Sequence, residues 1–82
     1  MGRHSHRFVE EYDGLVGFGL DRKTDEHTVA WVLQKFSDDA LLAALLPRLE
    51  PEELSGVFDL VHRLLRRHLD EAEYHRLFLK DD

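Results

Sequence analysis

The chain carries four helix-start signals in close succession, and they constrain its fold more than any other feature. Thr24 and Ser37 each precede two acidic residues, so each can cap a helix whose first turn is acidic, as the helix dipole favours. Pro51 follows a glutamate and suits a first helical position, and Asp70 has the spacing of a capping box with Glu73. The signals predict four helices, over about 25–36, 38–46, 51–69 and 71–79.

Apolar residues recur within these ranges at the spacing of amphipathic helices. The four stripes are Val29, Val32, Leu33 and Phe36; Leu41, Leu42, Leu45 and Leu49; Leu54, Val57, Phe58, Val61, Leu64 and Leu65; and Tyr74, Leu77 and Phe78. We therefore predict an all-α fold, with a compact bundle of about four helices in a domain of residues 24–82. Residues 1–23 contain four of the five glycines and predict a partly extended arm folded over the helices.

Length and composition exclude several classes of protein. A chain of 82 residues forms one domain, too small for a doubly wound nucleotide-binding fold or a barrel enzyme. The absence of cysteine removes disulfides, thiolate zinc sites and thiol catalysis. A net charge of −6 does not suit a nucleic-acid binder driven by overall charge. The predicted helix 38–46 also presents aspartate, alanine and leucine rather than base-reading side chains, so we expect no DNA binding.

The sequence also gives expectations for membranes and targeting. The longest apolar run, 40–46, is far short of the roughly 20 residues that cross a bilayer. The charged residues near the N-terminus are not followed by the apolar segment of a secretory signal. We therefore expect no membrane partner and a cytoplasmic location.

Little in the sequence favours catalysis or a cofactor. The three serines, Ser5, Ser37 and Ser55, lie outside any nucleophile-elbow context. Paired acids such as Asp38 and Asp39 are adjacent in sequence, so on a helix their carboxylates diverge. We expect a protein that is not an enzyme and holds no cofactor.

Two features favour binding to another protein. Trp31 points away from the apolar stripe of its helix, so it is either covered by the N-terminal arm or exposed as an interface anchor. Arg63, Arg66 and Arg67 lie away from the leucines of their helix and face solvent or a partner. Local pairing is the alternative for the arginines, through the i,i+4 pairs Asp59–Arg63, Arg66–Asp70 and Arg67–Glu71.

Histidines suggest a metal site near the N-terminus. After removal of Met1, the chain would begin Gly2-Arg3-His4, whose amine, backbone nitrogens and imidazole can surround Cu(II) or Ni(II) in one plane. His6 would add a further ligand. His68, by contrast, is predicted to be a half-buried, hydrogen-bonded histidine near a helix C-terminus.

Three segments carry a resemblance to a known group: HRFVEEYDGLVGFGLD from residue 6, TDEHTV from residue 24, and EAEYHRLFLKDD at the C-terminus. They are similar to short bacterial proteins described only as cytoplasmic. The resemblance covers nearly the whole chain and implies a bacterial cytoplasmic protein. It implies no catalytic or binding residues.

These observations predict a non-enzymatic protein–protein interaction or regulatory module, self-associating, for example as a homodimer. Trp31, Arg63, Arg66 and Arg67 are its predicted partner-binding residues. One alternative is a small Cu(II)- or Ni(II)-binding protein that uses His4 and His6. A second alternative is a phosphate or RNA contact through the three arginines.

Overall fold

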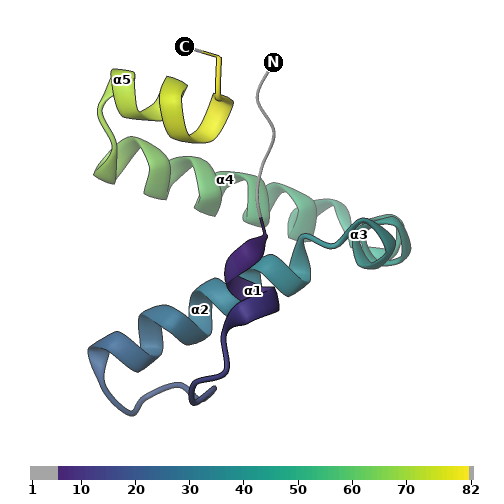
Figure 1. The fold of residues 1–82 in the computed structure, drawn as a ribbon. Coiled ribbons are helices and arrows are strands. Elements are labelled where there is room, and N and C mark those ends of the chain that lie inside the picture. The colour runs from purple at the N-terminus through teal and green to yellow at the C-terminus, as the bar shows by residue number, and fades with distance from the viewer. Residues whose placement is uncertain (1–5, 82) are drawn as a thin grey trace. The chain divides into compact units, whose positions relative to one another are not determined.

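The structure is a computed structural model, and it describes residues 6–81 (Figure 1). It confirms the all-α prediction, because the described residues contain helices and no strand. The elements are α1 (Arg7–Glu11), α2 (Arg22–Phe36), α3 (Asp39–Leu45), the 3₁₀ turn η1 (Leu46–Arg48), α4 (Pro51–His68), α5 (Glu71–Glu73) and the π-helical η2 (Tyr74–Leu79). The described part of the chain divides into two compact units, residues 6–47 and residues 48–81.

Helix α2 begins three residues before the predicted start, because Asp21 and not Thr24 is its N-cap. The Asp21 carboxylate accepts a hydrogen bond from the Thr24 backbone N–H at 2.9 Å and another from the Thr24 hydroxyl at 3.0 Å. The backbone bond is the main cause that lowers the pKa of Asp21. Thr24 was therefore wrongly predicted as the N-cap, although it does form the hydrogen bonds of the cap as the donor to Asp21.

The cap of α3 is displaced by one residue from the prediction. Asp38 is the N-cap, and its carboxylate accepts from the backbone N–H groups of Ala40 and Leu41 at 3.1 and 3.2 Å. Ser37 instead ends α2, where its hydroxyl donates to the Gln34 carbonyl at 3.0 Å. Aspartate and serine are comparable N-caps, so sequence alone does not decide between neighbours.

The starts of α4 and α5 confirm the prediction. Both have reciprocal capping boxes, one between Glu50 and Glu53 and the other between Asp70 and Glu73. In α4 the Glu50 backbone N–H donates to the Glu53 carboxylate at 2.8 Å. The predicted last helix is divided into one α-helical turn and the wider η2, which ends at Lys80 in a left-handed conformation.

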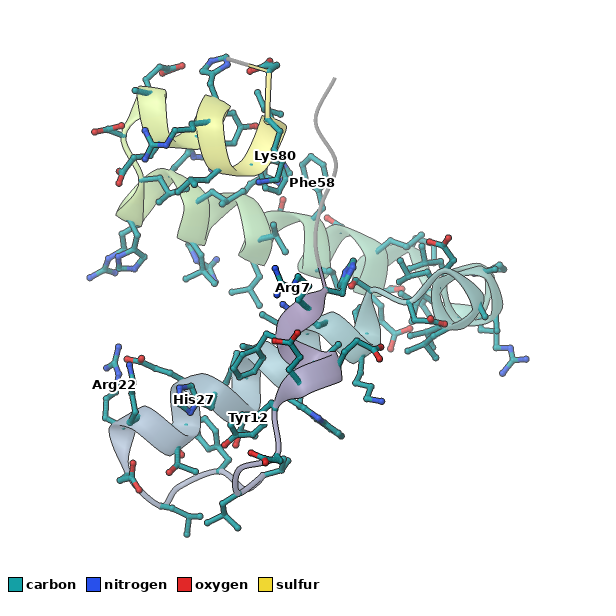
Figure 2. The ribbon with its side chains drawn as sticks, in the orientation of Figure 1. Arg7, Tyr12, Arg22, His27, Phe58 and Lys80 are labelled. Carbon is teal, nitrogen blue, oxygen red and sulfur yellow. The ribbon has the colours of Figure 1, made fainter. Side chains whose placement is uncertain are left out.

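The N-terminal arm contains a short helix, α1, where a partly extended segment was expected, and it packs on α2. Phe8 and Tyr12 stack on each other with ring centroids 4.9 Å apart. Their ring centroids lie 5.6 and 5.3 Å from that of the His27 imidazole of α2, and Figure 2 shows Tyr12 beside His27. The spacing of Phe8 and Tyr12 by four residues places them on one side of α1, so the helix brings both rings to α2.

A second tie joins the glycine-containing stretch to α2. The Thr28 hydroxyl donates to the Gly17 carbonyl and accepts from the Gly17 N–H, both at 3.0 Å. Gly19 has a positive φ of 92°, which favours glycine, and its N–H donates to the Asp25 carboxylate at 2.8 Å. These contacts fold the chain back onto the start of α2.

Apolar side chains remain largely accessible throughout the described residues. Thr28 is the one buried residue there, and none of the apolar residues of the predicted stripes reaches full burial. The order in each unit therefore depends on capping hydrogen bonds and on half-buried contacts.

Replacing Thr28 with Val tests the tie to Gly17. Valine has the shape of threonine but would leave the Gly17 N–H and carbonyl without their partner, which costs about 1–3 kcal/mol where such groups are shielded from water. We expect the free energy of unfolding, measured by urea titration of the helical circular dichroism, to fall accordingly. Thr28→Ser keeps the hydroxyl and should retain most of the stability. Equal losses in both variants would contradict this role.

Candidate interaction surface

A continuous apolar stripe on α4 is exposed to solvent. Its residues, here called the α4 stripe, are 39–48% exposed: Leu54, Val57, Leu60, Val61 and Leu64. At ~100° per residue they cover an arc of about 120° on one side of the helix. An arc of this width is what an amphipathic helix normally buries against a neighbour.

The chain covers a different side of α4 itself. Figure 1 shows α5 and the turns after it folding back alongside α4. The Phe78 ring meets the His62 ring in a T-shaped arrangement, with centroids 6.3 Å apart. His62, Leu65 and Leu69 are half-buried there. The predicted apolar face of this helix is thus divided: Leu65 is half-buried, whereas Phe58, which is 62% exposed, and four residues of the α4 stripe stay accessible. Leu60, the fifth residue of the α4 stripe, was not part of the predicted face.

His62, and not His68 as predicted, is the half-buried, hydrogen-bonded histidine of α4. Its ring stacks on Phe58 at 4.1 Å, and its Nδ1–H donates to the Phe58 carbonyl at 2.9 Å. His68 is exposed, so the prediction of a half-buried His68 is wrong. The helix runs to His68 and the chain then turns, so the returning segment meets α4 one and two turns earlier.

Arg63, Arg66 and Arg67 are exposed, as predicted. None of the three expected i,i+4 ion pairs forms among the described residues, whose ion pairs involve other side chains. Asp70 is engaged in its capping box. The arginines therefore keep their charge available for a partner. The proposed contact with phosphate or RNA stays a prediction.

Trp31 is half-buried, which lies between the two predicted alternatives. The Lys35 ammonium nitrogen lies 5.4 Å from the centre of its ring, within the range of a cation–π contact. His27 and Gln34 share this side of α2, and the Val9 N–H donates to the Gln34 side chain at 2.8 Å. The arm therefore lies along the side of α2 that carries Trp31.

The opposite side of α2 keeps its predicted apolar stripe exposed. Val29, Val32 and Leu33 are 42–59% exposed. Beside them is an open hollow of about 480 Å³, lined by Phe18, Arg22, Asp25, Glu26, Val29, Ala30 and Leu33. Covering the tryptophan side leaves this stripe as a second accessible apolar surface.

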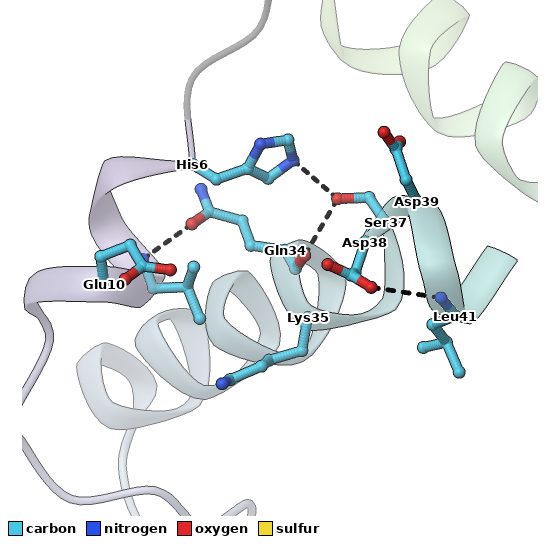
Figure 3. A pocket seen from close by; sticks show the side chains of 9 residues that line it. His6, Glu10, Gln34, Lys35, Ser37, Asp38, Asp39 and Leu41 are labelled. Atoms are coloured by element: carbon cyan, nitrogen blue, oxygen red, sulfur yellow. Dashed lines mark hydrogen bonds between the residues drawn. The ribbon is translucent and has the colours of Figure 1, made fainter.

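A more polar hollow of about 540 Å³ lies where α2 ends (Figure 3). His6 Nε2 lies 2.7 Å from the Ser37 hydroxyl oxygen, and that hydroxyl donates its proton to the Gln34 carbonyl. The imidazole then acts as the donor to Ser37 and is not placed to remove the serine proton. The pair is therefore arranged as a structural contact between the arm and the end of α2, and not as a nucleophile and its base.

Of the two predicted metal ligands, His4 and His6, the structure describes only His6. His6 is bonded to Ser37 as described, and His4 lies outside the described residues. Within residues 6–81, no three side chains of the His, Asp and Glu types gather as ligands for one ion.

The chain matches no protein-family model, and searches of curated proteins and of solved structures also gave no match. Every helix of the described part is too short or too polar to cross a membrane. The surfaces must therefore be interpreted from their own chemistry.

A histidine network holds the C-terminal segment together. His75 Nδ1 bonds to the Asp81 carboxylate at 3.0 Å, and its Nε2 lies 3.8 Å from the Glu71 carboxylate. The Asp81 hydrogen bond is the main cause that raises the pKa of His75 above 6.5. One imidazolium thus links the start of α5 to the residue beyond η2.

This network predicts a pH dependence of defined sign. Because the folded-state pKa of His75 is raised, its stabilisation is complete below pH 6.5 and is lost as the pH rises through the folded-state value. We expect an NMR titration of the imidazole to give a pKa above 6.5 that falls in Asp81→Asn, while Asp59→Asn serves as the matched control. A His75 pKa unaffected by Asp81→Asn would show that the contact does not form in solution.

Proposed function

We propose that this protein is a small helical protein–protein interaction module that self-associates and is not an enzyme. The observation that carries the proposal is the exposed α4 stripe in a chain whose described apolar residues are not buried. In this proposal, association supplies the core that a bundle of about four helices needs.

The hydrophobic effect gives the physical reason. Burying a leucine or valine fully contributes about 1.5–3 kcal/mol, so covering the exposed half of each residue in the α4 stripe adds about 1 kcal/mol. Folded domains are stable by only about 5–15 kcal/mol, so several such contacts are a large share of the total. A domain this small, without cysteines for disulfides, commonly gains stability from oligomerisation.

The arrangement of the exposed residues supports an interface rather than scattered surface apolar groups. Isolated exposed leucines are normal, whereas a continuous patch marks a site of interaction. The α4 stripe follows one side of an 18-residue helix, next to the arginines at its C-terminal end. Arg63, Arg66 and Arg67 are placed to form the polar rim of the contact, where charge guides the partner. Trp31 belongs to the other unit and would serve a second contact.

The resemblance to short bacterial cytoplasmic proteins supports placing this module in the cytoplasm. A reducing compartment suits a chain that has no cysteine and would use association, not disulfides, to stabilise its helices.

Sedimentation equilibrium over a wide concentration range tests the proposal. We expect reversible self-association and an unfolding midpoint that rises with protein concentration, because association stabilises the folded chain by mass action. Val57→Lys places a charge within the α4 stripe and should shift the equilibrium to monomer. Ser55→Lys adds the same charge on another side of α4 and should leave association unchanged. A monomer at every concentration, with a midpoint independent of concentration, would refute self-association.

A further inference from the structure

The charges of α4 are separated along its length. Glu52 and Glu53 lie in its first turn, whereas Arg66, Arg67 and His68 lie in its last turn. This polarity has a local cause, because acidic residues favour a helix N-terminus and basic residues a C-terminus. It also gives the exposed side of α4 an acidic end and a basic end.

One acidic, one apolar and one basic residue of α4 lie in line along the side of the helix that carries the α4 stripe. Glu53, Leu60 and Arg67 are separated by seven residues each. Seven residues are almost two helical turns, so the three lie close to one line along the helix, about 10 Å apart. Val57 and Leu64 alternate with them at spacings of four and three residues, the pattern of a coiled-coil seam.

We propose that the α4 stripe binds the α4 stripe of a second copy of this chain, antiparallel, with a two-fold axis at Leu60. This inference rests on the proposed function and names its partner and geometry. Glu53 and Arg67 lie equally far from Leu60, seven residues to either side. Leu60 therefore meets Leu60 of the second copy, while Glu53 meets Arg67 at both ends of the contact.

Charge complementarity decides the direction. A parallel pair would place Glu53 against Glu53 and Arg67 against Arg67, which is repulsive at both ends. The antiparallel pair makes two attractive contacts and also aligns the two helix dipoles favourably. The same geometry is isologous, so both chains use the same surface and the association closes at a dimer.

The neighbouring contacts leave this surface free for the partner. The Phe78 ring approaches α4 at His62, on the side away from Leu60. Leu60 is 46% exposed, and Arg67 has no ion pair within the described residues. Glu53 uses Oε1 to accept from the Glu50 N–H, so Oε2 is available to an arginine.

The size of the contact sets its expected strength. An 18-residue helix is about 27 Å long, so two such helices form an interface at the small end of the range for specific contacts. We expect a dimer that dissociates reversibly on dilution. Changing an attractive contact into a repulsive one at both ends should weaken it about tenfold.

Charge reversal with a matched control tests the inference. Arg67→Glu should weaken the dimer about tenfold in sedimentation equilibrium, because Glu53 then faces a second carboxylate at both ends of the contact. Arg76→Glu makes the same change in charge at an exposed position on η2, outside α4, and should leave the dimer as it is. Glu53→Gln removes one repelling charge while glutamine preserves the capping box, so adding it to Arg67→Glu should restore part of the lost affinity.

Disulfide trapping tests the direction, because the chain has no cysteine of its own. Leu60→Cys should form a covalent dimer on oxidation, since the two cysteines meet at the axis. Arg67→Cys should not, since the two sites lie at opposite ends of the contact. Efficient trapping through Arg67→Cys, or equal effects of Arg67→Glu and Arg76→Glu on a dimer that persists, would overturn the inference and leave self-association standing. A wild-type chain that stays monomeric would overturn both.

Discussion

Burial of apolar surface is the constraint on which the rest of this structure depends. The helices are amphipathic and well capped, yet within the described residues only Thr28 is buried. Capping hydrogen bonds are local and define where a helix begins, but they contribute about 1 kcal/mol each and do not supply a core. The α4 stripe and the exposed stripe of α2 are the surfaces through which that missing burial would come.

Polar and aromatic contacts order each unit although few of its apolar side chains are buried. In residues 6–47, α1 lies on the side of α2 that carries His27 and Gln34, and Thr28 holds Gly17 through two hydrogen bonds. In residues 48–81, ring contacts join η2 to His62 of α4. The chain thus uses part of its aromatic and polar side chains for contacts within each unit, while the α4 stripe, the stripe of α2 and the rings of Phe18 and Phe58 stay exposed.

Much of the fold was predictable from sequence, because caps and periodicity are local. The all-α class, the first helical position of Pro51 and the capping box at Asp70 were predicted correctly. The start of α2 was not, since Asp21 and Thr24 form one hydrogen-bonded pair and either is a good N-cap. The site was less predictable. The sequence predicted Arg67 as a partner-binding residue, whereas it did not predict Glu53 as one. The seven-residue spacing from Glu53 through Leu60 to Arg67 is visible in the sequence. It points to a shared surface only when η2 is known to cover the other side of α4.

Isotope-filtered NMR on a mixture of labelled and unlabelled chains tests most directly whether the α4 stripe is buried by another copy. Methyl groups of Val57, Leu60 and Leu64 should show contacts between chains, strongest for Leu60 with its own counterpart. If these methyl groups show contacts only within one chain, and a soluble paramagnetic agent broadens them at high protein concentration, the stripe is exposed in solution and the account is contradicted.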